Sequence, residues 1–180
     1  MALNDFVVNT PRPLPVILLC DTSGSMSVDG KIEALNEAVR QMINTFAQES
    51  RIRAEIQVGL ITFGQRVNEH LPLSAAKDIT DISPMQAAGM TPLGAALKRT
   101  CMLLEDKDII PSRAYRPVIV LVSDGYATDD WEAPLEDLNR SERASKASRF
   151  AMAIGQDADR IMLEDFIDDP EAPLFEAQHA

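Results

Sequence analysis

The sequence predicts an α/β domain with a doubly wound, mainly parallel central sheet, one short antiparallel edge strand, and helices on both faces. Residues 16–20 and 116–124 contain aliphatic runs without polar alternation, a pattern typical of central strands covered on both faces. An aspartate closes each run, Asp21 in the first and Asp124 in the second. Helical segments separate the strands, and this alternation predicts parallel strands joined by crossover helices.

The N-terminal half begins with an extended lead-in, followed by a long amphipathic helix. Residues 1–14 contain two prolines, which favour extended backbone, so we expect this segment to lead into the first strand. A helix is expected over 31–48, where apolar residues recur every three or four positions. The second strand should cover 55–63. A shorter and more polar strand should cover 67–73, which suits a sheet edge.

In the C-terminal half, the sequence predicts three further helices and three strands. Thr91 and Pro92 indicate a helix start, with the threonine as cap and the proline in the first turn. Residues 74–89 fit neither period and are expected to pack as a loop. Beyond the strand at 116–124, the expected elements are helices over 131–145 and 160–167 and strands over 149–155 and 172–176.

The composition fits one domain, taken as residues 15–180. With 180 residues, 46% of them hydrophobic and 25% charged, the chain can bury a core and should not remain disordered. Its net charge of −11 argues against a general affinity for nucleic acid or anionic membrane. The start of the chain lacks the pattern of a secretory signal, and no apolar run approaches the ~20 residues that span a bilayer, so a cytoplasmic location is expected.

Three polar segments form the candidate site. Asp21, Ser23 and Ser25 alternate in the loop after the first aliphatic strand, Thr91 opens a helix, and Asp124 closes the second aliphatic strand. Ligands of doubly wound sheets bind beyond the carboxyl ends of strands, where the winding reverses, so we expect these five side chains to converge. Taken singly, each has an ordinary structural explanation as a turn residue or a helix cap. Their combination is what predicts a site.

The chemistry of these side chains predicts a divalent cation. Five oxygen-bearing groups with no histidine or thiolate among them suit a hard ion, Mg²⁺ first and Mn²⁺ or Ca²⁺ as alternatives. Because only two of the five are carboxylates, water or an incoming carboxylate should take a free coordination position. The site is therefore expected to be a docking point. A scaffold in which the cluster binds no metal is the alternative.

Three motifs stand in order along the chain: DTSGSM at 21–26, GMTPLGAAL at 89–97 and SDGYATDDW at 123–131. Together they resemble the von Willebrand factor type A (vWA) domain, a Rossmann-like fold. The metal-ion-dependent adhesion site (MIDAS) of that family has the pattern Asp-x-Ser-x-Ser, then Thr, then Asp. The resemblance implies that Ser23 and Ser25 bind the metal directly, that Asp21, Thr91 and Asp124 bind directly or through water, and that an Asp or Glu of a protein partner supplies the last ligand.

Within this family the sequence looks most like the bacterial TerY-type proteins associated with tellurium resistance. That likeness implies an adaptor in a bacterial stress-resistance or phosphorylation-linked system, with a protein kinase and a phosphatase among its possible partners. Met90 stands where many relatives have glycine. The family's final helix is missing after about Phe175, which implies an apolar sheet face that a partner or another copy of the chain could cover.

Enzymatic chemistry finds little support in the sequence. The histidines are His70 and His179, and neither is placed for a Ser-His-Asp arrangement. A Mg²⁺-dependent aspartyl-phosphate phosphatase is the best enzymatic alternative, because Asp21 ends a strand. Such enzymes need a second aspartate two residues later, where this chain has Ser23. A non-enzymatic binding module is therefore predicted.

Three minor features of the sequence complete the expectations. Cys20 and Cys101 are expected to be reduced, buried thiols. Trp131 and Tyr126 could be exposed interface anchors or could pack the helix that follows them. An acidic patch near the proposed site is expected to be solvated or to meet a basic partner; it comprises Asp129, Asp130, Glu132, Glu136 and Asp137.

Overall fold

In the computed structural model, which describes residues 11–49 and 53–177, six strands form one sheet in the order β3-β2-β1-β4-β5-β6. Neighbouring strands are parallel except β2 and β3, which pair antiparallel at one edge. The predicted fold class is confirmed. The strands are β1 (Arg12–Asp21), β2 (Ala54–Phe63), β3 (Val67–Ala75), β4 (Val118–Ser123), β5 (Ser148–Ile154) and β6 (Phe175–Ala177).

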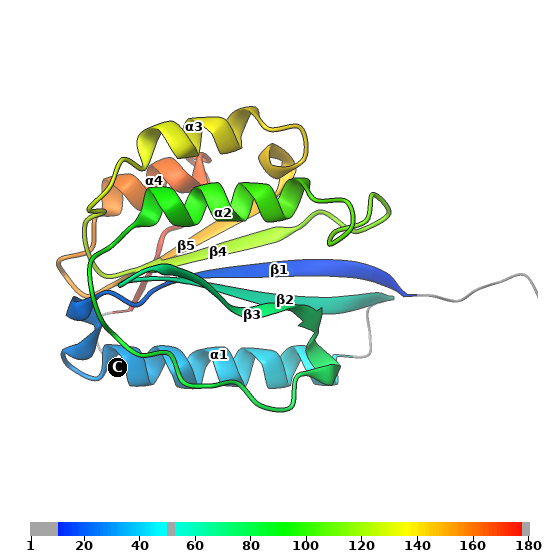
Figure 1. Cartoon of the computed structure of the whole chain (residues 1–180), viewed down its shortest axis with the longest axis horizontal. Coiled ribbons are helices and arrows are strands. Elements are labelled where there is room, and N and C mark those ends of the chain that lie inside the picture. The colour runs from blue at the N-terminus through cyan, green and yellow to red at the C-terminus, as the bar shows by residue number, and fades with distance from the viewer. Residues whose placement is uncertain (1–10, 50–52, 178–180) are drawn as a thin grey trace, which may run out of the picture.

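Helices cover both faces of the sheet, as Figure 1 shows. Helix α1 (Lys31–Gln48) packs on one face, and α2 (Leu93–Glu105), α3 (Glu132–Arg140) and α4 (Arg160–Ile167) pack on the other. Side chains alternate between the faces of a strand, so β1 contributes to two cores: Ile17 and Leu19 pack on the α2–α4 side, and Val16 and Leu18 pack on the α1 side. No helix in the described residues is both long and apolar enough to cross a membrane.

The reversal of winding occurs between β1 and β4. From β1 the chain crosses over α1 to β2 on one side, and β4 pairs with β1 on the other. Register in the parallel β1–β4 pair runs to Cys20 opposite Val122, and the next residues along, Asp21 and Ser123, are the last residues of their strands. The two aliphatic strands therefore deliver their polar ends to one place, as their sequences predict.

The helix expected over 131–145 is too long. Helix α3 ends at Arg140, and Ser141 already has extended backbone with φ −68° and ψ 145°. Beyond it, the backbone N–H groups of Arg143 and Ala144 donate to Glu105 Oε1 at 2.7 and 2.8 Å. This carboxylate comes from α2, and it binds amides that a continuing helix would have used internally. A tertiary contact thus ends the helix where the local pattern does not.

Smaller departures occur in the first and the last strand of the chain. Strand β1 begins at Arg12, inside the expected lead-in, because its pairing with β2 continues back to Arg12 opposite Ala54. The last strand is 175–177 instead of 172–176, and it pairs in parallel with β5. Residues 1–10 lie outside the described part of the chain.

One face of β5 and β6 is incompletely covered. Ala151 and Ala153 of β5 are fully buried in the core on the α2–α4 side. Phe150, which points to the opposite face of the strand, is 40% exposed, and Phe175 of β6 is 46% exposed. Large apolar side chains therefore remain open to solvent at this edge.

Candidate metal site

Asp21 lies wholly buried at the end of β1. Its Oδ1 accepts the backbone N–H of Ser23 at 2.9 Å, and its Oδ2 accepts the hydroxyl of Ser123 at 2.7 Å. Burial raises the pKa of Asp21, and the hydrogen bonds from Ser23 and Ser123 oppose that shift. Both carboxylate oxygens are thus occupied in joining the loop after β1 to the end of β4.

The two serines extend this network to Asp124. A tight 3₁₀ turn over Gly24–Ser27 places Ser23 Oγ 3.0 Å from Ser25 Oγ. The Ser25 hydroxyl in turn donates to Asp124 Oδ1 at 2.8 Å. Ser23 and Asp124 are buried, whereas Ser25 is exposed, so the network runs from the interior to the surface. Four of the five predicted site residues are therefore brought together.

The loop that leads to Thr91 lies against the first loop. The Gly24 N–H donates to the Gly89 carbonyl at 2.9 Å, and the Ala88 N–H donates to the Thr22 carbonyl at 2.8 Å. Gly89 has φ +83°, and a Cβ there would lie 2.4 Å from Gln65 Cα, in the turn between β2 and β3, so this position requires glycine. The loop that leads to Thr91 is thus packed against that turn as well as against the loop after β1.

Thr91 is 7% exposed and is held by its backbone. Its N–H donates to Thr128 Oγ1 at 3.0 Å, and its carbonyl accepts the Thr128 N–H at 2.9 Å. Among the hydrogen bonds of the described residues, none joins the Thr91 hydroxyl to the four linked side chains. The geometry thus places the Thr91 loop beside the cluster and leaves the ligand role of Thr91 a prediction.

The cap predicted at Thr91 is wrong. The N-cap residue of α2 is Pro92, which makes no side-chain capping bond. Instead Asp129 receives the N–H groups of Gly94 and Ala95 at 2.8 and 3.0 Å. A carboxylate at a helix N-terminus is favourable, because it satisfies free amides and the helix dipole. Asp129 was expected to be part of a solvated patch; it is a capping residue from a distant segment.

Lys31 is the site residue that sequence reasoning missed. Its Nζ lies 2.9 Å from Asp124 Oδ2, and its side chain is 15% exposed. The sequence places Lys31 only at the start of α1, and no local pattern pairs it with a residue 93 positions later. The sequence feature that could have drawn attention to Lys31 is a positive charge at a helix N-terminus, where the helix dipole disfavours it.

The oxygen spacing fits a small hard cation. Ligands at about 2.1 Å from a Mg²⁺-like ion and at right angles to one another lie about 3 Å apart. Ser23 Oγ and Ser25 Oγ are 3.0 Å apart, and Ser25 Oγ is 2.8 Å from Asp124 Oδ1. Within the described residues, no group of three or more His, Cys, Asp or Glu side chains is placed to hold a metal. An ion here would therefore depend on the hydroxyls.

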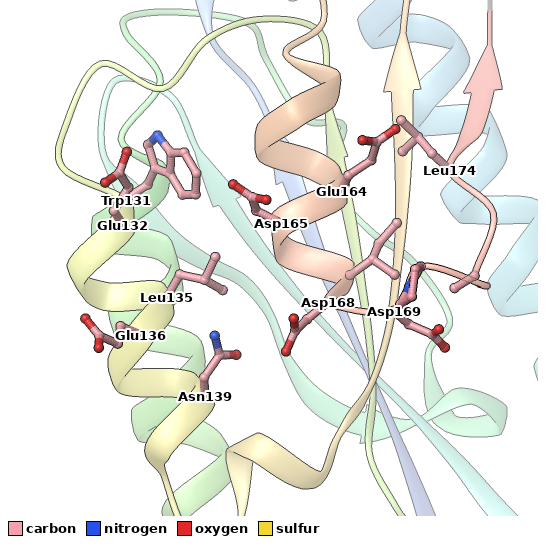
Figure 2. A pocket seen from close by; sticks show the side chains of 13 residues that line it. Trp131, Glu132, Leu135, Glu136, Asn139, Glu164, Asp165, Asp168, Asp169 and Leu174 are labelled. Carbon is pink, nitrogen blue, oxygen red and sulfur yellow. The ribbon is translucent and has the colours of Figure 1, made fainter.

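A separate acidic groove of about 840 Å³ lies between α3 and α4 (Figure 2). Of its 13 lining residues 6 are carboxylates, against 28 Asp and Glu among the 180 residues of the chain. They are Glu132, Glu136, Glu164, Asp165, Asp168 and Asp169. In Figure 2, Asp165 and Asp168 point toward α3, while Glu132 and Glu136 point away from α4. The acidic groups surround the groove without converging.

The other candidate functional residues lie outside the cluster. Trp131 is partly buried and packs against the core on the α2–α4 side, which supports its packing interpretation, whereas Tyr126 is 68% exposed. The His70 ring contacts the Ser83 carbonyl from the edge strand β3. Cys20 is buried, and burial raises the pKa of its thiol to about 12.

The prediction that both cysteines are buried is wrong for Cys101. Its side chain is only partly buried, because it lies on the side of α2 where Ser141 follows the end of α3, and its Sγ is 3.0 Å from Ser141 Oγ. Neither cysteine forms a disulfide within the described residues.

Comparison with known families finds one match over nearly the whole chain. The model of the von Willebrand factor type A domain matches residues 16–179. A search of curated proteins gave no match.

Solved structures with the same fold include proteins from a mussel and from Plasmodium vivax. Proximal thread matrix protein 1 of the mussel byssus aligns with TM-score 0.74 and 20% identity over 93% of this chain and 44% of its own. A second structure of that protein, with TM-score 0.73 and the same identity and coverage, has zinc in its MIDAS motif. Manganese-loaded TRAP protein of Plasmodium vivax aligns with TM-score 0.69 and 19% identity over 93% of this chain and 69% of its own. The chain spans less than half the length of the mussel protein.

Proposed function

Because the chain belongs to the von Willebrand factor type A domain family, we propose that its strand-end site holds a divalent cation and uses it to bind an Asp or Glu side chain of a protein partner. The observation that carries this proposal is the continuous oxygen network from Ser23 through Ser25 to Asp124, at spacings that suit ligands of one ion. Mg²⁺ is the proposed ion, with Mn²⁺ and Ca²⁺ as alternatives.

In this proposal the residues have different tasks. Ser23 and Ser25 bind the cation directly, while Asp21, Asp124 and Thr91 bind it directly or through water. Asp21 also fixes the loop, because its carboxylate holds the Ser23 amide and the Ser123 hydroxyl. The cation supplies a positive centre at the surface, where the exposed Ser25 leaves room for an incoming carboxylate.

The metal-loaded relatives support this assignment without identifying the ion used by this chain. Zinc occupies the MIDAS motif of the mussel protein, and manganese is present in the Plasmodium protein. Their sequences are only 20% and 19% identical to this chain, so they show a shared fold. The metal and the partner of this chain remain our proposal.

The biological setting that we propose is an adaptor in a bacterial stress-resistance or phosphorylation-linked system. The TerY-type likeness of the motifs supports this setting, with a protein kinase and a phosphatase as candidate partners and the cytoplasm as the location. A host in which the protein co-purifies with neither enzyme under any metal condition would count against it.

Metal titration followed by thermal unfolding tests the proposed site. A ligand that binds only the native state raises its melting temperature, by an amount that grows with concentration. Mg²⁺ and Mn²⁺ should stabilise the wild type and should not stabilise Ser25→Ala. Ser27→Ala is the matched control, because the Ser27 hydroxyl donates to the Gly24 carbonyl in the same turn and lies outside the network. No shift for the wild type at millimolar metal would favour a metal-free scaffold.

A pull-down with and without chelator tests the second half of the proposal. Partner capture by the wild type should require metal, and Asp124→Asn should capture no more than the chelated wild type. Equal capture by Asp124→Asn and wild type in the presence of metal would contradict the docking role.

The phosphatase alternative finds no supporting geometry. A nucleophilic carboxylate has to reach a substrate phosphorus, whereas Asp21 is fully buried and both of its oxygens accept hydrogen bonds. We propose that the protein does not hydrolyse phosphoesters. Turnover of p-nitrophenyl phosphate that Asp21→Asn abolishes would contradict this.

A further inference from the structure

Lys31 does not stabilise the helix that carries it, so its contact with Asp124 needs another explanation. Lys31 is the first residue of α1, following Gly30 in left-handed conformation with φ 70°. A cation at a helix N-terminus faces the positive end of the dipole and the free N–H groups, which is unfavourable. The Lys31 side chain is nevertheless only 15% exposed, and its ammonium is directed at the wholly buried Asp124 carboxylate.

The lysine binds the oxygen of Asp124 that does not contact the serines. Its Nζ is 2.9 Å from Asp124 Oδ2, whereas Ser25 Oγ is 2.8 Å from Oδ1. A Cβ placed on Gly155 would lie 3.7 Å from both Cε and Nζ of Lys31, so the lysine passes beside the end of β5. Lys31 thus neutralises Asp124 from the side, and Oδ1 stays directed toward the serine hydroxyls.

The charges of the site decide what this contact does. With Asp21 and Asp124 ionised, the two carboxylates contribute −2 and Lys31 contributes +1. A bound divalent cation then leaves the site with a net charge of +1, and the same site without Lys31 would be neutral. The difference of one positive charge opposes the metal and favours an anionic ligand.

We propose that Lys31 is a specificity-determining residue of the metal site: it weakens divalent-cation binding and makes the metal-loaded site favour an anionic carboxylate over neutral water at its open position. This inference rests on the proposed function. In this inference Lys31, a residue outside the five-residue MIDAS pattern, sets the balance between affinity for the metal ion and affinity for the partner's carboxylate. Charges a few ångströms apart in a partly buried site alter equilibrium constants by about tenfold or more.

Replacement of Lys31 by glutamine tests the proposal, because glutamine keeps a donor for Asp124 Oδ2 and removes the charge. Mn²⁺ affinity is measured by calorimetry. At saturating Mn²⁺, carboxylate binding is probed by the shift in melting temperature with acetate, relative to chloride at equal ionic strength. K31Q should bind Mn²⁺ about tenfold more tightly than wild type and gain less stabilisation from acetate. A residue that only holds the fold together would not move these two readouts in opposite directions.

Two controls keep the charge effect separate from general effects. K31R keeps the positive charge and should behave like wild type in both measurements. K77Q makes the same chemical change at Lys77, whose exposed side chain pairs with Glu55 at 3.4 Å, and should also behave like wild type. If K31Q does not fold, Lys31→Met refills the same space without a charge and takes its place.

The outcomes separate this inference from the proposed function. Mn²⁺ binding by wild type and K31Q with equal affinity would overturn the inference and leave the metal site standing. Weaker Mn²⁺ binding by K31Q would overturn it in favour of a positioning role. Tighter Mn²⁺ binding with an unchanged acetate effect would overturn the selection of carboxylate. Absence of Mn²⁺ binding in every variant would overturn the proposed function, and the inference with it.

Discussion

The strand-end cluster of Asp21, Ser23, Ser25 and Asp124 and the groove between α3 and α4 are both rich in carboxylate or hydroxyl oxygens, yet they differ in arrangement. Side-chain oxygens of the cluster lie 2.8 to 3.0 Å apart across loops from two parallel strands. The groove has three times as many carboxylates as the cluster, six against two, and they point in different directions (Figure 2).

This difference shows that convergence, and not the number of acidic groups, defines the candidate metal site. The cluster side chains are ordered by partners: Asp21 by Ser23 and Ser123, and Asp124 by Ser25 and Lys31. In the groove, the carboxylates are exposed at the surface, where side chains are ordered weakly and charges are screened by solvent. Mutations that affect the two regions unequally test this contrast.

The largest effect on stability is expected for Asp124→Ala. This change leaves the Lys31 ammonium without its anionic partner at 15% exposure, and removing one member of a buried pair costs more than the pair contributes. We expect the metal-free protein to lose about 2 to 3 kcal/mol of unfolding free energy and to remain folded. Urea unfolding in the presence of chelator measures this loss of unfolding free energy. Asp165→Ala in the groove is the control and should change stability by less than about 0.5 kcal/mol. Equal losses for the two variants would remove the contrast.

A smaller effect is expected for Asp129→Ala. Asp129 comes from the acidic patch of the sequence, but its carboxylate accepts the N–H groups of Gly94 and Ala95 at the start of α2. Loss of such a cap costs about 1 kcal/mol. Asp137→Ala, on the exposed side of α3, is the matched control from the same patch. Urea unfolding should separate the two, and a stability of Asp129→Ala equal to that of Asp137→Ala would mean that the cap contributes nothing.

Local sequence patterns sufficed for the strands and for the convergence of their ends. The aliphatic runs before Asp21 and Asp124 show which strands are central, and parallel pairing carries both aspartates to the same edge of the sheet. The alternation of Asp21, Ser23 and Ser25 is also local, and one tight turn realises it. These features depend on period and position, which a single sequence contains.

The missed features that shape the site and its flanking helices depend on a charged side chain that reaches another element. Lys31 contacts Asp124 across 93 positions, Asp129 caps a helix 35 positions earlier, and Glu105 binds the backbone beyond α3 across 38. No periodicity encodes such pairs, because the partner is chosen by the tertiary fold. The same contacts decide where α3 stops, how α2 begins and which charge faces the metal site.

Asp21→Asn is expected to change the pH dependence of stability. Burial raises the pKa of Asp21 in the folded protein, with its hydrogen bonds opposing the shift. A carboxyl whose pKa is higher in the folded state destabilises that state when ionised, so its protonation stabilises the fold as the pH falls through the raised pKa. Asparagine removes this contribution. In chelator, the stability of wild type relative to Asp21→Asn should therefore rise as the pH is lowered from neutrality.

Urea unfolding of wild type and Asp21→Asn, from neutral to acidic pH, measures the contribution of Asp21 to the free energy of unfolding. Asp165→Asn serves as the exposed control and should follow the wild-type profile. A wild-type stability that falls relative to Asp21→Asn on acidification would show that the hydrogen bonds from Ser23 and Ser123 outweigh burial at this carboxyl.

The smallest effect is expected for a double change in the groove, Asp165→Asn with Asp168→Asn. In Figure 2, Asp165 of α4 and Asp168, which directly follows α4, both point toward α3. They are therefore the groove residues best placed to attract a cation. Because their oxygens are not organised into a coordination sphere, the Mn²⁺-induced rise in melting temperature should match that of wild type. The same measurement on Ser25→Ala, which removes one neutral hydroxyl, should show no rise. If the double change abolished the response and Ser25→Ala kept it, carboxylate number would outweigh convergence and the metal site would have to be assigned to the groove.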